Sequence, residues 1–167
     1  EAHKNLGNTL KELGRLDEAE ASYTHAIALK PDLAEAHNNL GVTLKELGRL
    51  DEAEASYTHA IALKPDYTEA HNNLGNTLKE LDRLDEAEAS LRQAIALKPD
   101  YTQAHNNLGN TLKELCRLDE AEASLRQAIA LKPDYAQAHN HLGVTLRERG
   151  RLDEAEASYT HAIALKP

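Results

Sequence analysis

The sequence predicts an all-α solenoid of five stacked helix-turn-helix repeats. Three observations predict it. The chain of 167 residues repeats itself every 34 residues. Each repeat holds two segments whose apolar residues recur at helical spacing, and proline or glycine stands where each segment ends. Because such a hairpin cannot bury its apolar face alone, stacked neighbours must cover it. We therefore expect one array over residues 1–167, with repeats at 1–33, 34–67, 68–101, 102–135 and 136–167.

Composition argues against several classes of partner. The net charge of −9 disfavours nucleic acid, because binding a phosphate backbone requires a basic surface. No apolar run reaches the roughly 18 residues of a membrane-spanning helix, so we expect no membrane partner and a cytoplasmic location. Cys116 is the single cysteine, which excludes an intrachain disulfide and zinc sites built on several cysteines.

The first helix of each repeat is predicted by its leucines. In the second repeat Leu40, Leu44 and Leu47 lie at positions i, i+4 and i+7, which is one face of a helix. Asp32 with Glu35 has the spacing of a capping box at the helix start. The matching pairs in later repeats are Asp66–Glu69, Asp100–Gln103 and Asp134–Gln137.

The turn after the first helix is predicted to be left-handed. Gly14, Gly48 and Gly150 occupy it in three repeats, and glycine is the residue that most readily ends a helix in this conformation. Asp82 and Cys116 stand at the same position in the other two repeats. Asp tolerates a left-handed backbone better than Cys does, so we expect strain of about 1 kcal/mol at Cys116.

The second helix of each repeat is predicted by the same kinds of sequence signal. In the second repeat Leu50, Ala53 and Tyr57 share one face, and Asp51 with Glu54 has the spacing of a capping box. Proline cannot continue a helix, and a preceding lysine favours the negative end of the helix dipole. Lys-Pro pairs are therefore expected to stop the second helices at Pro31, Pro65, Pro99 and Pro133.

These positions resemble the tetratricopeptide repeat family over the whole chain. The consensus small and large positions of that family fall on Leu40, Gly41, Leu44, Ala53, Tyr57, Ala60 and Pro65. The small residues among them are expected where two helices cross closely, and His37 replaces the first consensus aromatic residue. The resemblance implies a right-handed superhelix whose first helices line a concave groove.

A narrower resemblance concerns the phrases AHNNLG, NTLKEL and LDEAEASY. They are similar to the repeats of O-linked N-acetylglucosamine transferases and of their bacterial SPINDLY-like relatives. Those proteins have an asparagine ladder that holds the substrate polypeptide, and the resemblance implies a similar ladder at the matching positions of this chain.

Asparagines form the candidate peptide-binding site. On a helical wheel of the second repeat, Asn39 lies with Glu35 opposite Leu44, and Asn38 flanks this stripe. An amide both donates and accepts, so a column of amides suits a peptide backbone whatever its side chains. The ladder positions are Asn5, Asn39, Asn73 and Asn107, with His141 in the fifth repeat. The flanking positions are Asn38, Asn72, Asn106, Asn76, Asn110, Lys45, Lys79 and Lys113.

Two alternatives to this ladder remain open. The asparagines can form a merely solvated face. A carboxylate clamp, which some family members use to hold the C-termini of heat-shock chaperones, matches at Lys4, Asn8 and Asn39. However, Glu69 stands where that clamp needs a basic residue, and a carboxylate there would repel a terminal carboxylate.

The sequence contains no recognisable motif for catalysis or for cofactor binding. The chain lacks a glycine-rich phosphate loop and a serine nucleophile elbow. His37 and its equivalents recur once per repeat, and no two histidines have the i, i+4 spacing of a helical zinc site. We interpret this histidine column as packing or hydrogen bonding at helix contacts, and we expect no cofactor and no enzyme activity.

Three hypotheses about function remain. The chain is a protein-interaction module that binds an extended peptide in its groove, the substrate-recognition arm of a larger glycosyltransferase, or a scaffold that self-associates. The last hypothesis depends on the final helix, whose apolar face we expect to contact another molecule end to end. That face contains Leu152, Ala155, Ala162 and Ile163, at positions that we expect to be buried in earlier repeats.

Overall fold

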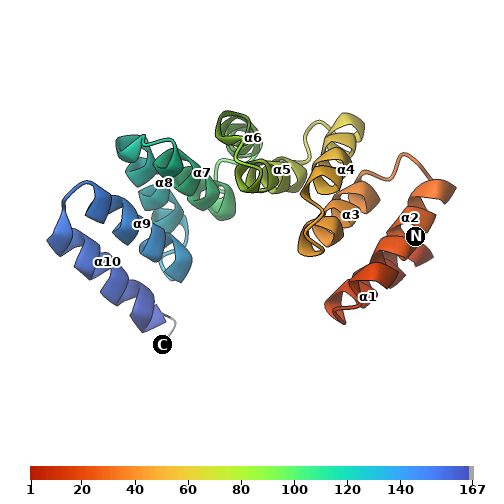
Figure 1. Ribbon diagram of the computed structural model, residues 1–167, viewed down its shortest axis with the longest axis horizontal. Helices are drawn as coiled ribbons and strands as arrows, with labels where there is room; N and C mark the ends of the chain where they lie inside the picture. The colour runs from red at the N-terminus through yellow and green to blue at the C-terminus, as the bar shows by residue number, and fades with distance from the viewer. Residues whose placement is uncertain (166–167) are drawn as a thin grey trace. The chain divides into compact units, whose positions relative to one another are not determined.

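The computed structural model describes residues 1–165, and over that range the chain forms ten α-helices joined by short turns (Figure 1). The all-α class and the five helix pairs predicted from the sequence are therefore confirmed. The second helices of the first four repeats end two residues before the prolines predicted to stop them. The helices are α1 (Ala2–Glu12), α2 (Leu16–Leu29), α3 (Ala34–Glu46), α4 (Leu50–Leu63), α5 (Thr68–Glu80), α6 (Leu84–Leu97), α7 (Thr102–Glu114), α8 (Leu118–Leu131), α9 (Ala136–Glu148) and α10 (Leu152–Leu165).

The chain divides into two compact units, residues 1–82 and residues 83–167. In the first unit α1–α2 and α3–α4 form hairpins, and α2 and α4 also pack against α3 and α5. In the second unit α7–α8 and α9–α10 form hairpins, while α6 and α8 pack against α7 and α9. The helices α2, α4 and α8 thus each contact both their own hairpin partner and the first helix of the next repeat, which is how solenoid repeats stabilise one another.

The hydrophobic core is built from small clusters that join neighbouring repeats. In the second repeat Leu44, Ala53 and Tyr57 are buried together, and Leu74 of the third repeat packs against them. Glycine allows the two helices to approach, because a Cβ atom at Gly41 would lie 2.7 Å from Cε1 of Tyr57. The same close approach occurs at Gly7 beneath Tyr23, at Gly109 beneath Leu125 and at Gly143 beneath Tyr159.

The turns after the first helices are left-handed, as predicted. The φ angles are +72° at Gly14, +77° at Gly48 and +75° at Gly150. Asp82 and Cys116 adopt the same conformation, with φ angles of 60° and 59°. Both residues carry a Cβ atom, which makes this conformation unfavourable for them by about 1 kcal/mol or more.

The predicted capping boxes are wrong. The N-cap of α3 is Leu33, one residue after Asp32, and no side chain caps this helix. The N-cap of α4 is Arg49, so Asp51 already lies in the first turn, where its charge favours the positive end of the helix dipole. The pairs Asp32–Glu35, Asp51–Glu54, Asp66–Glu69, Asp100–Gln103 and Asp134–Gln137 all stand beside helix starts that have no side-chain cap.

None of the helices within residues 1–165 combines the length and the hydropathy that crossing a bilayer requires.

Candidate functional site

Inside each unit, consecutive first helices contact each other, and predicted ladder positions lie along these contacts. In the first unit α1 packs against α3 and α3 packs against α5. Asn39 on α3 and Asn73 on α5 are half-buried, whereas Asn5 on α1 is exposed. We use the name amide row for five of the asparagine side chains on these three helices: Asn5, Asn8, Asn38, Asn39 and Asn73.

Each ladder amide on α3 and α5 is held by an asparagine of the preceding repeat. Asn39 donates from Nδ2 to Oδ1 of Asn8 at 2.9 Å, and the same oxygen accepts the hydroxyl of Tyr23 at 2.7 Å. Burial raises the pKa of Tyr23 to about 12, so this hydroxyl keeps its proton and remains a donor at neutral pH. Asn73 donates from Nδ2 to Oδ1 of Asn38 at 3.1 Å. The ladder amides are therefore oriented rather than freely solvated.

Three of the flanking asparagines are buried, although the helical wheel placed their position beside the peptide-binding stripe. Asn38 is 6% exposed, Asn72 is 7% exposed and Asn106 is fully buried. The helical wheel considers one helix, whereas in the structure α5 contacts Asn38 and α9 contacts Asn106. In the first unit, Asn38 thereby becomes the acceptor that positions Asn73.

The second unit contains an equivalent link. His141 of α9 occupies the ladder position, and its Nδ1 lies 3.0 Å from Oδ1 of Asn106 on α7. An imidazole thus takes the place that an amide has in the first unit. Asn107 is half-buried on α7, and Asn110 donates to Glu114 one turn later at 3.4 Å. Asn76 is half-buried on α5.

Two lysines beside the amide row, Lys4 and Lys45, form ion pairs between repeats of the first unit. Lys45 lies 2.9 Å from the carboxylate of Glu80, and Lys79 and Lys113 are half-buried at the matching positions of α5 and α7. Lys4 contacts Glu35 at 2.5 Å. That hydrogen bond raises the pKa of Lys4 and lowers the pKa of Glu35. A carboxylate clamp would have to displace Glu35 from Lys4, which weakens that alternative.

A second set of ion pairs joins the second helices, and the sequence analysis missed it. The arginines that precede α4, α8 and α10 each bind a glutamate of the same helix and a glutamate of the preceding repeat. Arg49 contacts Glu52 at 2.6 Å and Glu20 at 2.7 Å. The matching contacts to the preceding repeat are Arg117–Glu88 at 2.5 Å and Arg151–Glu122 at 2.6 Å. The recurrence of Arg and Glu at fixed positions in every repeat is the signal that could have revealed it.

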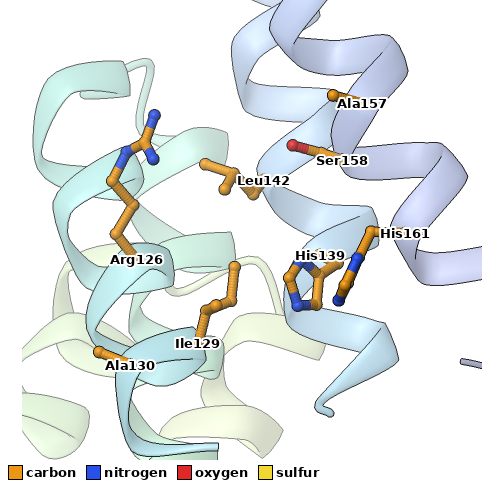
Figure 2. A pocket seen from close by; sticks show the side chains of 8 residues that line it. All are labelled: Arg126, Ile129, Ala130, His139, Leu142, Ala157, Ser158 and His161. Carbon is orange, nitrogen blue, oxygen red and sulfur yellow. The ribbon is translucent and has the colours of Figure 1, made fainter. Parts of the chain in front are cut away.

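The histidine column packs at helix contacts, as the sequence analysis expected. His37 and its equivalents in the next three repeats place Nε2 at 2.8–3.0 Å from the carbonyl of the preceding proline. In three repeats the ring also faces a second histidine, with centroids 4.1–4.3 Å apart. Figure 2 shows one such pair, His139 and His161, in a cavity of about 420 Å³ that Arg126 also lines. Among residues 1–165 no three His, Cys, Asp or Glu side chains gather to hold a metal ion.

Comparison with known families identifies the repeat. Two tetratricopeptide repeat models match, one over residues 32–100 and again over 66–134, the other over residues 106–167. A further model, described as TPR repeat, matches residues 7–48. These matches support the family, and they give no support to the narrower resemblance to glycosyltransferases.

Solved structures show the same architecture. MamA is 26% identical with a TM-score of 0.85, over 96% of this chain and 94% of that chain. A thermophilic TPR protein of Thermus thermophilus is 30% identical with a TM-score of 0.83, over 99% and 91%. YrrB, described as a TPR protein with an unusual peptide-binding site, is 25% identical with a TM-score of 0.78, over 99% and 85%. Comparison with curated proteins gave no match. From its matching models and its structural relatives, the chain belongs to the tetratricopeptide repeat family.

Proposed function

We propose that this protein is a protein-interaction module that binds an extended polypeptide along the first helices of its repeats. The amide row carries the proposal. An asparagine amide has two N–H donors and a carbonyl acceptor, and the bonds described above use one N–H of Asn39 and one N–H of Asn73. Each of these half-buried side chains keeps a second N–H for a ligand, and the carbonyl of Asn73 is also available.

Fixed amides suit a peptide backbone for two reasons. An extended segment offers one N–H and one carbonyl group per residue, so it can match donors and acceptors spaced along consecutive helices. The amides are held in place before binding, so little conformational entropy is lost when the ligand arrives. Each contact contributes roughly 0.5–1.5 kcal/mol, which gives weak binding that tolerates many sequences.

Preference among ligands then depends on the residues beside the amide row. Glu69, Gln103 and Gln137 are exposed one turn before the ladder positions, and Asn76 and Asn110 lie near them. Lys45 is neutralised by Glu80, and the chain has a net charge of −9. A neutral or basic polypeptide therefore complements this face better than an acidic one does.

The relatives agree with this proposal. YrrB is described as having a peptide-binding site, and the family resemblance implies a groove lined by first helices. In the second unit we include Asn107, which stands at the ladder position there. A substrate-recognition arm of a larger glycosyltransferase would use the same face, but none of the matches favours that role.

Photo-crosslinking locates the binding face directly. A benzophenone amino acid is introduced at Glu69, which is exposed beside Asn73, and separately at Thr58, which is exposed on α4. Both proteins are exposed to a cell extract, and the captured peptides are identified by mass spectrometry. We expect specific adducts at position 69 and none at position 58, and equal capture at both positions would contradict the proposal.

Substitution then tests the amides themselves. Peptides captured at position 69 are titrated against the variant Asn39→Ala/Asn73→Ala, with Thr58→Ala as the matched control. We expect affinity to fall by tenfold or more in the double variant and to remain unchanged in the control. Asn39→Ala is measured alone as well, because Asn8 keeps its bond to Tyr23 and the fold is least disturbed. Unchanged affinity in both variants would exclude the ladder.

A further inference from the structure

We propose that the α9–α10 end of this protein binds the α1–α2 hairpin of a second copy of the same chain, so that the contact between successive repeats continues from one molecule into the next. This inference stands apart from the proposed function, because it uses the two ends of the chain and shares only Asn5 with the amide row. Four features of the two ends support it.

The first feature is an apolar hollow on α10. Among the described helices α10 packs mainly against α9, and residues of α9 and α10 together line a cavity of about 530 Å³. Ile163 is 66% exposed, whereas Ile95 and Ile129 at the same position pack against core clusters. The cavity is lined by Ala136, Gln137, Asn140, Tyr159, Ala162 and Ile163. Of the apolar face expected from the sequence, Ala155 is already buried in a cluster that includes Leu125 and Leu142.

The second feature is the exposed face of α1. Leu6 is 49% exposed. Its equivalent in the second repeat, Leu40, packs against the buried cluster of the first repeat. Ala2 is exposed, whereas Ala36 at the matching position is fully buried. The apolar groups that α3 inserts against the first repeat are therefore present on α1 and open to solvent.

The third feature is charge. In three described contacts between repeats, the arginine before a second helix binds a glutamate of the preceding repeat. Arg15 is the arginine at this position in the first repeat, and it binds Glu18 of its own helix. Glu156 is the matching glutamate of the last repeat, and it is exposed. The two partners of one further pair thus stand at opposite ends of the chain.

The polar link between first helices shows the same arrangement. Asn73 donates to Asn38 and His141 bonds to Asn106, each across one repeat boundary. Asn5 has the ladder position of Asn73, and Asn140 has the position of Asn38 and Asn106. Both Asn5 and Asn140 are exposed.

The choice of a second copy as occupant follows from sequence identity. The helix α10 is identical to α2, residue for residue. The helix α1 differs from residues 36–46 of α3 only at Lys4 and Asn8. Docking of α1 onto α10 therefore repeats the α2–α3 contact with nearly the same side chains. Such a head-to-tail contact uses two different surfaces, so each molecule retains one free end for another.

Analytical ultracentrifugation of the 167-residue chain tests the proposal. Sedimentation is measured from about 5 µM to about 1 mM, because association driven by mass action grows with concentration. We expect the weight-average mass to rise above the 18.4 kDa of one chain. A mass that stays at one chain over the whole range would overturn the proposal.

Charge reversal distinguishes this interface from any other. Arg15→Glu and Glu156→Arg each place like charges together, and we expect each to weaken association about threefold, since such exposed pairs contribute modestly. The double variant restores an opposite pair with its polarity inverted and should recover the original association. Equal association in all four proteins would show that the molecules meet elsewhere.

An apolar substitution gives an independent readout. Ile163→Asp places a charge in the hollow that Leu6 of the second copy would fill, and we expect association to weaken at least tenfold. Thr58→Asp, on the exposed side of α4, is the matched control and should associate as the parent does. If Ile163→Asp associates as strongly as the control, the α10 face is not the interface and the proposal fails.

Discussion

Replacing Asn73 by alanine measures what the amide row contributes to stability. In the structure Asn73 donates to Oδ1 of Asn38 at 3.1 Å, and Asn38 is 6% exposed. Removing the donor leaves a buried carbonyl without this partner, which costs about 1–3 kcal/mol. Because alanine is the better helix former, the substitution also adds up to about 0.7 kcal/mol to the free energy of unfolding. We therefore expect Asn73→Ala to lower the free energy of unfolding by about 0.5–2 kcal/mol.

Two other positions of the same row provide graded comparisons. In Asn39→Ala the acceptor Asn8 keeps the hydroxyl of Tyr23, so the lost bond of about 0.5–1.5 kcal/mol is largely offset by helix propensity. Asn5 is exposed, so Asn5→Ala should stabilise the protein by up to about 0.7 kcal/mol. The expected order of stability is Asn5→Ala, then the parent and Asn39→Ala, then Asn73→Ala.

Thermal unfolding followed by circular dichroism resolves these differences. For a chain of this length 1 kcal/mol corresponds to a shift in Tm of roughly 2–4 °C. If Asn73→Ala were as stable as Asn5→Ala, the link between Asn73 and Asn38 would contribute nothing to stability. The view that the ladder amides are oriented by the preceding repeat would then be wrong.

Three further outcomes follow from the structure. Cys116→Gly should raise the free energy of unfolding in urea by about 0.5–1 kcal/mol, because it removes a Cβ atom from a left-handed turn. Asp82→Gly should raise it by less. Equal or reversed effects would show that the turn carries no such strain. Gly41→Ala should destabilise by about 1–3 kcal/mol, since the new methyl would lie 2.7 Å from the ring of Tyr57, and an unchanged Tm would mean that the ring moves freely. Burial lowers the pKa of His37 below its usual 6.5, so the folded state binds fewer protons there than the unfolded state. The contribution of neutral His37 to the free energy of unfolding is therefore present above about pH 6.5 and is lost as the pH falls through the lowered pKa. Measuring Tm against pH in the parent and in His37→Gln checks this.

The helices and turns were predictable because they depend on local sequence. Leucine spacing and the residue at the turn set the first helices and their left-handed ends, including the unusual conformation of Cys116. The capping boxes failed because spacing alone does not locate the first helical residue: the N-cap falls on Leu33, one residue beyond Asp32. Asp32 therefore lies just outside α3, whereas Asp51 lies two residues beyond the N-cap of α4.

The side-chain partners at the candidate site were not predictable in the same way. A helical wheel places Asn38 beside a solvated stripe, because it contains no neighbouring helix. The burial of Asn38 and its bond to Asn73 depend on how closely successive first helices approach. The arginine network has the same origin, since Arg49 has one glutamate within its own helix and another in the preceding repeat. Only the packed geometry shows that it binds both.

The glycine beneath each second helix restricts how these repeats can diverge. A Cβ atom at Gly41 would meet Tyr57, and a Cβ atom at Gly109 would meet Leu125 at 2.5 Å, so exchanging the aromatic ring for leucine does not create room. The position sixteen residues after the glycine can therefore hold either tyrosine or leucine, whereas the glycine itself cannot be replaced by a residue with a Cβ atom. Duplicated copies of this repeat will keep that glycine fixed long after their outer surfaces have lost their resemblance.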